Sequence, residues 1–302
     1  MSAMILCDAH ADTLHRMATG GRGPYDLSLE RLKQGGVSLQ VLAMYVGEDP
    51  EPAVVAGLYD RMWQAAEQLI AEGWVQAMDP AEAGTDQPHF LLSVEGCEIF
   101  EPGLHVIDDY RRRGVRMAAI TWNYVNKLGT PACENQTDGL TDYGLKAARH
   151  MQKLKMAVDV SHLNIPGFYD LLNKTDAPPL ASHSCARALC DHTRNLTDQQ
   201  LKDLFQAGGY VGINFLPYFL TPGGKNCTID TVIDHIDHMH QLGGSGMVGF
   251  GSDFDGISQK PEGLDNPSDF PKLTKRLRER GYSQADVEAI AGLNFLAYYK
   301  RI

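Results

Sequence analysis

The sequence predicts an α/β protein built as a (β/α)8 TIM barrel with extra helices at the C-terminus. Short apolar runs alternate with longer amphipathic stretches along the chain of 302 residues, and no composition break or low-complexity linker divides them. There are eight such runs, most of them followed by a helical pattern, within about 250 residues, which is typical of a parallel barrel. We therefore expect residues 1–302 to form a single barrel domain.

The predicted strands are runs that are mostly apolar on both faces, as in a parallel sheet that other elements cover on both sides. In chain order they are Met4–Ala9, Val37–Val46, Phe90–Val94, Val115–Trp122, Ala157–Ser161, Pro179–Ser182, Gly209–Phe215 and Met247–Gly251. The alternative is an open, doubly wound sheet. It is disfavoured because no G-x-G-x-x-G motif follows the first run.

Amphipathic stretches between these runs predict helices. They are Ala53–Glu72, Leu104–Arg113, Asp142–Leu154, Ile165–Asn173, Thr197–Gln206 and Ile229–Leu242. Thr197 and Thr228 are expected N-caps, because a threonine side chain can accept a hydrogen bond from a free backbone N–H. After Gly256 we expect a long loop and then two closing helices within residues 261–302.

Composition and charge exclude several classes of protein. The chain has 27 basic and 38 acidic residues, so its formal charge of −11 repels nucleic acids and anionic membranes. No apolar run is long enough to span a membrane, and the N-terminus lacks the features of a signal peptide. Six cysteines without C-x-x-C pairing then indicate reduced thiols. We expect a cytoplasmic protein with a small-molecule substrate.

Histidines and carboxylates gather where the predicted strands end. These segments are Asp8–Asp12, Val94–Gly96, Asp159–His162, Ser182–Ser184 and Gly251–Gly256. In a barrel enzyme the carboxyl ends of the strands face the active site, and these side chains suit zinc or a similar divalent ion. A buried structural histidine could explain His10-x-Asp12 alone, but repetition at further strand ends favours a metal centre.

A second group of histidines has a different explanation. His235, His238 and His240 stand at helical spacing and could hold a metal ion. However, they precede the last strand and lie away from the expected barrel mouth, so a packing or solvated role is favoured. No lysine ends the fourth strand, where some barrel metallohydrolases place a bridging lysine, so Glu95 is the best candidate for a bridge between two ions.

Taken in order, these motifs resemble the membrane (renal) dipeptidases and their soluble bacterial relatives, a metallopeptidase branch of the amidohydrolase-like barrels. The resemblance spans nearly the whole chain. It is carried by the five strand-end segments above, by Arg194-Asn195, by Val248–Phe250 before the last of those segments, and by Pro261–Leu264.

The resemblance implies two zinc ions as cofactors and five metal ligands. The first ion would be bound by His10 and Asp12, the second by His162 and His183, and both by Glu95 as a bridge. It also implies a homodimer.

The resemblance further implies roles for residues that do not bind metal. Asp253 would carry the proton, and Arg194 would hold the substrate's terminal carboxylate with its two-pronged donor group. Trp122 departs from the pattern, because animal members have a histidine there that helps to hold the substrate carbonyl. Either Trp122 or Asn123 binds the substrate in its place, or the substrate range differs.

The sequence thus leads to a functional hypothesis with two alternatives. The hypothesis is a zinc-dependent dipeptidase that hydrolyses small dipeptides, including those with a C-terminal D-residue, through a hydroxide that bridges the metal ions. One alternative is a binuclear amidohydrolase that acts on N-acyl amino acids or another small amide. The other is a non-catalytic metal-binding scaffold, which would require a missing ligand or proton carrier, and none is missing.

Overall fold

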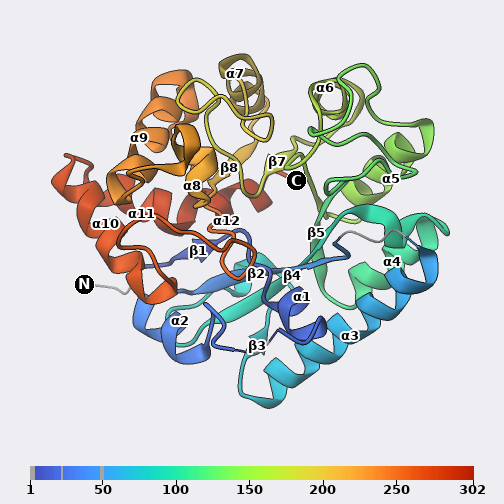
Figure 1. Cartoon of the computed structure of the whole chain (residues 1–302), viewed down its shortest axis with the longest axis horizontal. Coiled ribbons are helices and arrows are strands. Elements are labelled where there is room, and N and C mark those ends of the chain that lie inside the picture. Colours follow the sequence, from blue (N-terminus) through green and yellow to red (C-terminus); the bar gives the residue numbers. More distant parts are fainter. Residues whose placement is uncertain (1–3, 22, 48–50) are drawn as a thin grey trace.

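A closed barrel of parallel strands forms the centre of the molecule, and helices surround it (Figure 1). The computed structural model describes residues 4–21, 23–47 and 51–302. The barrel strands are β1 (Cys7–Asp8), β2 (Leu39–Tyr45), β4 (His89–Glu95), β5 (Val115–Ala119), β6 (Ala157–Asp159), β7 (Leu180–Ala181), β8 (Tyr210–Ile213) and β9 (Val248–Phe250). Each pairs with the next, and β9 pairs with β1 to close the ring. The predicted barrel is confirmed.

One further strand was not predicted. The strand β3 (Val75–Gln76) pairs with His89 and Phe90 at the start of β4. The strand β5 pairs with β4 only from Leu92 onward, so β3 and β5 use successive parts of one edge of β4. A strand of two residues has no periodicity of its own, and its formation depends on the neighbour with which it pairs.

Helices follow most of the strands, as predicted. The α-helices of the described residues are α1 (Thr13–Ala18), α2 (Leu29–Gly35), α3 (Pro52–Ala71), α4 (Leu104–Arg112), α5 (Asp142–Lys153), α6 (Ile165–Lys174), α7 (Asp198–Gln206), α8 (Pro217–Leu220), α9 (Ile229–Met239), α10 (Phe270–Glu279), α11 (Gln284–Glu288) and α12 (Asn294–Tyr299). All six predicted helices are present, and α1, α2 and α8 are additional short ones.

The two predicted N-caps, Thr197 and Thr228, both stand directly before a helix, and Thr197 makes the expected side-chain hydrogen bond. At the start of α7, Thr197 Oγ1 accepts from the backbone N–H of Gln200, and the Gln200 side chain accepts from the N–H of Thr197. At the start of α9, the N–H of Thr228 donates to Thr231 Oγ1. Both contacts satisfy backbone donors that the first turn of a helix leaves free.

The C-terminal segment closes the barrel from its amino-terminal end. A π-helical turn (Ala289–Leu293) joins α11 to α12, so the segment forms two helical stretches after the loop, as predicted. Phe295 and Tyr298 of α12 belong to the same buried cluster as Leu39, Leu91 and Tyr210 of the barrel strands. In Figure 1, α10 lies beside α9 and close to α2, so this part of the C-terminal segment packs near the first helices of the chain.

Alternation along β4 directs its last residue into the barrel. Phe90, Leu92 and Val94 belong to the core between the barrel and its helices, whereas Leu91 belongs to the cluster inside the barrel. Since successive side chains of a strand point to opposite faces, Glu95 lies on the inner side with Leu91. The chain therefore places a carboxylate inside the barrel at its carboxyl-terminal end.

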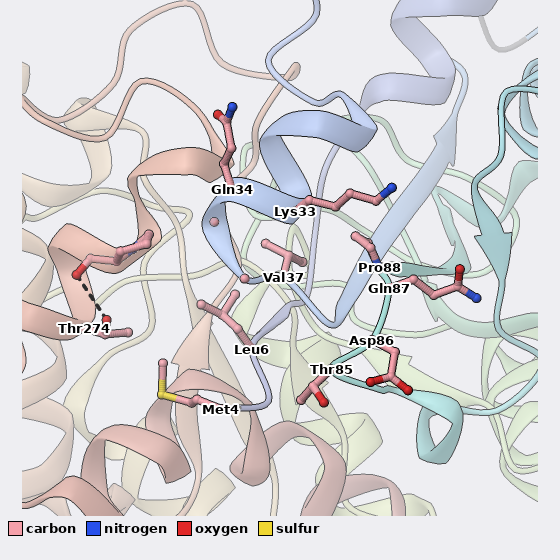
Figure 2. A pocket seen from close by; sticks show the side chains of 13 residues that line it. Met4, Leu6, Lys33, Gln34, Val37, Thr85, Asp86, Gln87, Pro88 and Thr274 are labelled. Carbon is pink, nitrogen blue, oxygen red and sulfur yellow. Dashed lines mark hydrogen bonds between the residues drawn. The ribbon is translucent and has the colours of Figure 1, made fainter. Parts of the chain in front are cut away.

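A pocket of about 540 Å³ lies at the other end of the barrel. Figure 2 shows that its walls come from the segments before β1 and β4, from α2 and from α10, with Leu6 and Val37 among the lining residues. It contains none of the predicted site residues. No helix among the described residues is long and apolar enough to cross a membrane.

Candidate active site

Side chains from several strand ends converge at the carboxyl-terminal mouth of the barrel, where barrel enzymes carry their active sites. His10 and Asp12 follow β1, Glu95 ends β4, His162 follows β6, His183 follows β7 and Asp253 follows β9. All six have side chains that are at least largely buried. The structure therefore brings together the five predicted metal ligands and the predicted proton carrier.

Two histidines and one carboxylate form the tightest part of this cluster. Glu95 Oε1 lies 2.9 Å from His162 Nε2 and 3.3 Å from His183 Nε2. The two Nε2 atoms lie 3.1 Å from each other. One carboxylate oxygen thus faces two imidazole nitrogens from neighbouring strands.

The other oxygen of Glu95 faces the residues that follow β1. Glu95 Oε2 lies 3.6 Å from His10 Nε2, which is itself 3.4 Å from Asp12 Oδ1 and 4.0 Å from Asp253 Oδ1. Potential ligand atoms of His10, Glu95 and His183 lie within 4.8 Å of one another, as do those of His10, Asp12 and Asp253. Glu95 therefore has one oxygen close to His10 and the other close to His162 and His183.

Neighbouring side chains fix which ring nitrogen of His162 and of His183, the two inner histidines, faces the cluster. Asn123 Oδ1 accepts a hydrogen bond of 2.8 Å from His162 Nδ1–H. Ser182 Oγ donates to Asp159, so its lone pair accepts from His183 Nδ1–H at 2.7 Å. In both rings the hydrogen is on Nδ1, which leaves the Nε2 lone pair directed at Glu95. Such contacts orient metal-binding histidines in other proteins.

Burial and nearby charges shift the pKa values of the histidines in this cluster in different directions. Burial lowers the pKa of His162 and His183 well below the usual histidine value, and the nearby positive charges of Arg194 and His10 add to that effect. Both rings are therefore neutral, as a metal ligand must be. Burial also opposes a charge on His10, but Glu95, Asp12 and Asp253 outweigh it and raise the pKa of His10 to about 10.

The carboxylates of the cluster lack enough positive charge from the chain itself. Burial raises the pKa of Glu95 well above its usual range, Asp12 and Asp253 raise it further, and His10 and Arg194 only partly oppose this. Buried carboxylates this close together are costly unless a cation or a proton compensates them. The cluster therefore favours the binding of a positive ion.

The cluster fits a divalent metal ion by its unsatisfied atoms and its donor types. His10 Nε2 and Asp12 Oδ1 are buried and make no hydrogen bond. Unpaired buried polar atoms of this kind are rare in proteins and need a partner. Imidazole nitrogens and carboxylate oxygens are donors that zinc and similar ions prefer.

Two of these residues have a backbone conformation that residues other than glycine rarely adopt. His162 has a φ of 69° and Asp253 a φ of 65°, both in the left-handed region. This conformation is uncommon for residues other than glycine, and it concentrates at functional sites where the surroundings enforce it. It turns both side chains toward the cluster at points where the chain leaves its strand.

Arg194 also reaches the cluster, from the segment between β7 and α7. Its guanidinium Nη2 lies 2.9 Å from His183 Nε2, and its side chain is buried. Burial lowers the pKa of Arg194, whereas Glu95 and Asp253 counteract that effect. A buried, forked cation beside the cluster is well suited to bind a carboxylate.

Trp122 and Asn123 take different positions after β5. The Asn123 side chain holds His162, as described above, so its amide oxygen is already engaged with a predicted metal ligand. The Trp122 ring lies 5.3 Å from the Tyr45 ring and 6.2 Å from the His162 ring, between centroids. Trp122 thus forms part of an aromatic wall at the mouth. Tyr45 was not predicted there because it ends the apolar run of β2.

Asn214 is a second site residue that the sequence did not reveal. It follows β8 directly, and its Nδ2 donates a hydrogen bond of 2.9 Å to Asp253 Oδ2. Burial and Asp12 raise the pKa of Asp253 to about 7, although His10 and this hydrogen bond oppose the increase. The only available signal was one polar residue within the apolar run Gly209–Phe215.

Within the second group of histidines, His235 has a packing role, which is one of the two roles predicted for the group. His235 is buried, and its Nδ1 accepts a hydrogen bond from the N–H of Ala186 at 3.0 Å. Its Nε2 donates to the carbonyl of Leu220 at 3.0 Å. Because both ring nitrogens are engaged with backbone groups, His235 joins the segment after β7 to α8 and α9.

Comparison with known proteins identifies relatives over the whole length. The family model "Membrane dipeptidase (Peptidase family M19)" matches residues 1–302. An uncharacterised Klebsiella pneumoniae protein, encoded in the pqqA 5′ region, is 34% identical over 262 residues, or 80% of this chain and 96% of that protein. An uncharacterised dipeptidase of Schizosaccharomyces pombe is 39% identical over 217 residues, or 70% of this chain. The match covers 52% of the yeast protein, so this chain spans about half of its length.

Solved structures agree in fold and in family. A family M19 metallopeptidase described as dipeptidase AC superimposes with a TM-score of 0.89 at 26% identity, with 99% of each chain covered. A metallopeptidase from Rhodobacter sphaeroides, solved with a phosphinate mimic of the dipeptide L-Ala-D-Ala, gives a TM-score of 0.88 at 26% identity and the same coverage. The family model matches every position of the sequence, and this chain belongs to the membrane dipeptidase family, peptidase family M19.

Proposed function

We propose that this chain is a zinc-dependent dipeptidase that hydrolyses small dipeptides, including those with a C-terminal D-residue, within a single barrel domain over residues 1–302. The observation that carries the proposal is the position of Glu95, which has one oxygen near His162 and His183 and the other near His10. Family membership supports the reaction class. The phosphinate mimic of L-Ala-D-Ala bound to the Rhodobacter sphaeroides relative supports the substrate class.

Two ions would be held by the buried cluster. His10 and Asp12 would bind one ion, His162 and His183 the other, and Glu95 both. Their burial, their donor atoms and the orientation of the inner rings support this assignment. Divalent ions bound there would supply Lewis-acid activation of a water molecule and of the scissile carbonyl.

Asp253 would move the proton during hydrolysis. Its carboxylate accepts a proton as water attacks the carbonyl carbon, and it gives that proton to the amine nitrogen as the C–N bond breaks. Its position in the cluster, with Oδ1 4.0 Å from His10 Nε2, suits both directions of transfer. The proton is thus returned in each cycle, and Asp253 is unchanged at the end.

Arg194 would bind the free C-terminal carboxylate of the substrate. The guanidinium offers parallel N–H donors to both oxygens of a carboxylate. Because the site is buried and its dielectric constant is low, the attraction between the two charges is stronger than in water. This contact would select dipeptides over internal peptide bonds, because only a terminal residue carries the carboxylate.

The aromatic wall favours a second candidate function. Trp122 presents an apolar ring where animal relatives have a histidine, and Tyr45 and Tyr124 lie beside it. An apolar acyl group would pack against such a surface, whereas the charged amine of a dipeptide would gain less from it. A binuclear amidohydrolase acting on N-acyl amino acids is therefore the alternative.

The experiment is a substrate panel on protein whose metal content is measured on the same sample. It compares L-Ala-L-Ala, L-Ala-D-Ala and N-acetyl-alanine for the wild type and for Asp253→Asn. We expect the wild type to hydrolyse the dipeptides faster and Asp253→Asn to fold and keep its metal but lose most turnover. Hydrolysis of the N-acyl substrate alone would favour the alternative, and full turnover by Asp253→Asn would overturn its assigned role.

We also propose a homodimer and a cytoplasmic location, which the family resemblance and the composition imply. Light scattering during gel filtration would give the mass of the particle in solution. A mass of one chain would contradict the dimer.

A further inference from the structure

Asn214 is fully buried, and both ends of its side-chain amide are engaged. Asn214 Oδ1 accepts a hydrogen bond of 2.6 Å from the backbone N–H of Leu216, and Nδ2 donates one of 2.9 Å to Asp253 Oδ2. Because the Leu216 N–H can only donate, the amide oxygen must face it. The NH2 group is therefore directed at Asp253.

The backbone of Asp253 is fixed independently of this contact. Its N–H donates to the carbonyl of His10 at 3.1 Å, and its carbonyl accepts from the N–H of Gly256 at 3.1 Å. With φ held at 65°, the main freedom left to the residue is rotation of its side chain. Asn214 is the group that restrains this rotation by binding one of the two carboxylate oxygens.

The restraint distinguishes the two oxygens of Asp253. The oxygen Oδ2 is bonded to Asn214, whereas Oδ1 lies 4.0 Å from His10 Nε2 inside the cluster. An oxygen that accepts a hydrogen bond from an amide is a poorer place for a proton than one that does not. Oδ1 is therefore the oxygen that is oriented to take a proton from a water molecule at the cluster.

We propose that Asn214 is a positioning residue for hydrolysis, which directs Asp253 Oδ1 toward the reacting water and leaving amine. The proposal rests on the proposed function, because it requires Asp253 to carry the proton. An O–H bond forms at Oδ1 as water loses its proton, and that bond breaks when the proton passes to the amine nitrogen. Asn214 itself gains and loses no proton.

The decisive variant is Asn214→Asp. Its carboxylate keeps an acceptor for the Leu216 N–H but presents an oxygen instead of a donor to Asp253 Oδ2. We expect kcat for L-Ala-D-Ala to fall at least about tenfold, because positioned proton transfer contributes 10²–10⁴-fold to catalysis. We expect KM and metal content to change little, whereas the melting temperature falls because the variant buries a second carboxylate beside Asp253. Wild-type kcat in this variant would overturn the proposal.

A double-mutant cycle separates positioning from a general structural role. If Asn214 acts through Asp253, then Asn214→Asp lowers kcat no further once Asp253→Asn is present. If the two losses multiply, Asn214 acts by another route and the proposal is wrong. Full activity of Asp253→Asn alone would instead refute the proposed function, so the two failures are distinguishable.

A second variant tests the same contact from the other side. Leu216→Pro removes the N–H that orients the amide, and Leu216 already has a φ of −65°, which proline adopts. We expect a fall in kcat with little change in KM, since the amide loses one of the two hydrogen bonds that hold it in place. An unchanged kcat in Leu216→Pro, in protein that melts as the wild type does, would contradict the proposed orientation. Tyr169→Phe, which removes a hydroxyl bonded to Asp203 outside the site, serves as the control.

Discussion

The Nε2 atoms of His162 and His183 lie 3.1 Å apart with their lone pairs directed at each other and at Glu95. Each ring is held in this orientation by a hydrogen bond at Nδ1, from His162 to Asn123 and from His183 to Ser182. Facing lone pairs repel unless a cation lies between or beside them, and within the chain the Arg194 guanidinium lies 2.9 Å from His183 Nε2. The side chains that orient these two rings should therefore matter for metal binding as much as the candidate ligands themselves.

Ser182→Ala should weaken metal binding without unfolding the protein. The change removes the acceptor for His183 Nδ1, so the ring can turn or change its tautomer. Loss of such an outer contact typically costs about 10–100-fold in metal affinity. Competition with a zinc chelator measures the affinity, and Ser38→Ala, a buried serine bonded to the N–H of Leu6, serves as the control. Equal affinity in the two variants would contradict this role of Ser182.

Gly256→Ala should disrupt the site through a collision with two carboxylates. A Cβ at this position would lie 2.1 Å from Asp12 Oδ2 and 2.5 Å from Asp253 Oδ1. Both side chains must move, so we expect less bound metal and little activity. Gly57→Ala in α3 is the matched control, since its Cβ would meet only the end of Arg61, at 3.8 Å. Metal content and kcat are measured for both; normal values for Gly256→Ala would contradict the geometry.

Arg194→Lys should impair substrates that carry a free C-terminal carboxylate. Lysine keeps the positive charge but loses the forked pair of donors. A hydrogen bond to a charged group contributes about 1.5–3 kcal/mol, so kcat/KM should fall about 10–100-fold. Measurements on a dipeptide and on the same dipeptide with a C-terminal amide separate the effects. A similar loss for both substrates would show that Arg194 does not bind the C-terminal carboxylate.

His235 should make the stability of the fold depend on pH. Burial lowers the pKa of His235, although its hydrogen bond to Leu220 partly opposes this. His235 takes up a proton near pH 6.5 in the unfolded chain, but only at a lower pH in the folded chain. The contribution of neutral His235 to the free energy of unfolding is therefore present above pH 6.5 and is lost as the pH falls. The loss is at most about 1.4 kcal/mol per pH unit.

His235→Gln tests that dependence by urea unfolding. The glutamine does not titrate, and we expect it to lower the free energy of unfolding by about 1–3 kcal/mol at pH 8, since it cannot reproduce both backbone contacts. The difference from the wild type should shrink between pH 8 and pH 5. A difference that stays constant over this range would contradict a neutral, buried His235.

The barrel and the cluster of histidines and carboxylates at its mouth could be predicted from the sequence because both depend on local patterns. Apolar runs identified the strands, although most predicted strands are longer than the observed ones. For example, Met4–Ala9 contains β1 at Cys7–Asp8. The chain leaves the sheet where it must turn His10 and Asp12 into the mouth. The polar residues that follow these strands stand out against the apolar runs, so the side chains of the cluster could be named in advance.

The contacts that orient the ligands could not be predicted from local patterns. Asn214 and Asp253 are 39 residues apart, and Ser182 and Asp159 are 23 apart, so their pairing depends on how neighbouring strands lie in the barrel. The strand β3 was missed for the same reason, because it exists only through its pairing with β4. The predicted substrate role of Asn123 overlooked His162, which engages its amide oxygen.

In the proposed function, Glu95 joins two metal ions that the hydrolysis of dipeptides requires. The most direct measurement is a titration of chelator-treated protein with zinc, in which bound metal and the hydrolysis of L-Ala-D-Ala are followed together. We predict that activity is absent in metal-free protein and reaches its maximum at two ions per chain, and that Glu95→Gln binds fewer ions and stays inactive. Full hydrolysis by protein without bound metal would contradict the account.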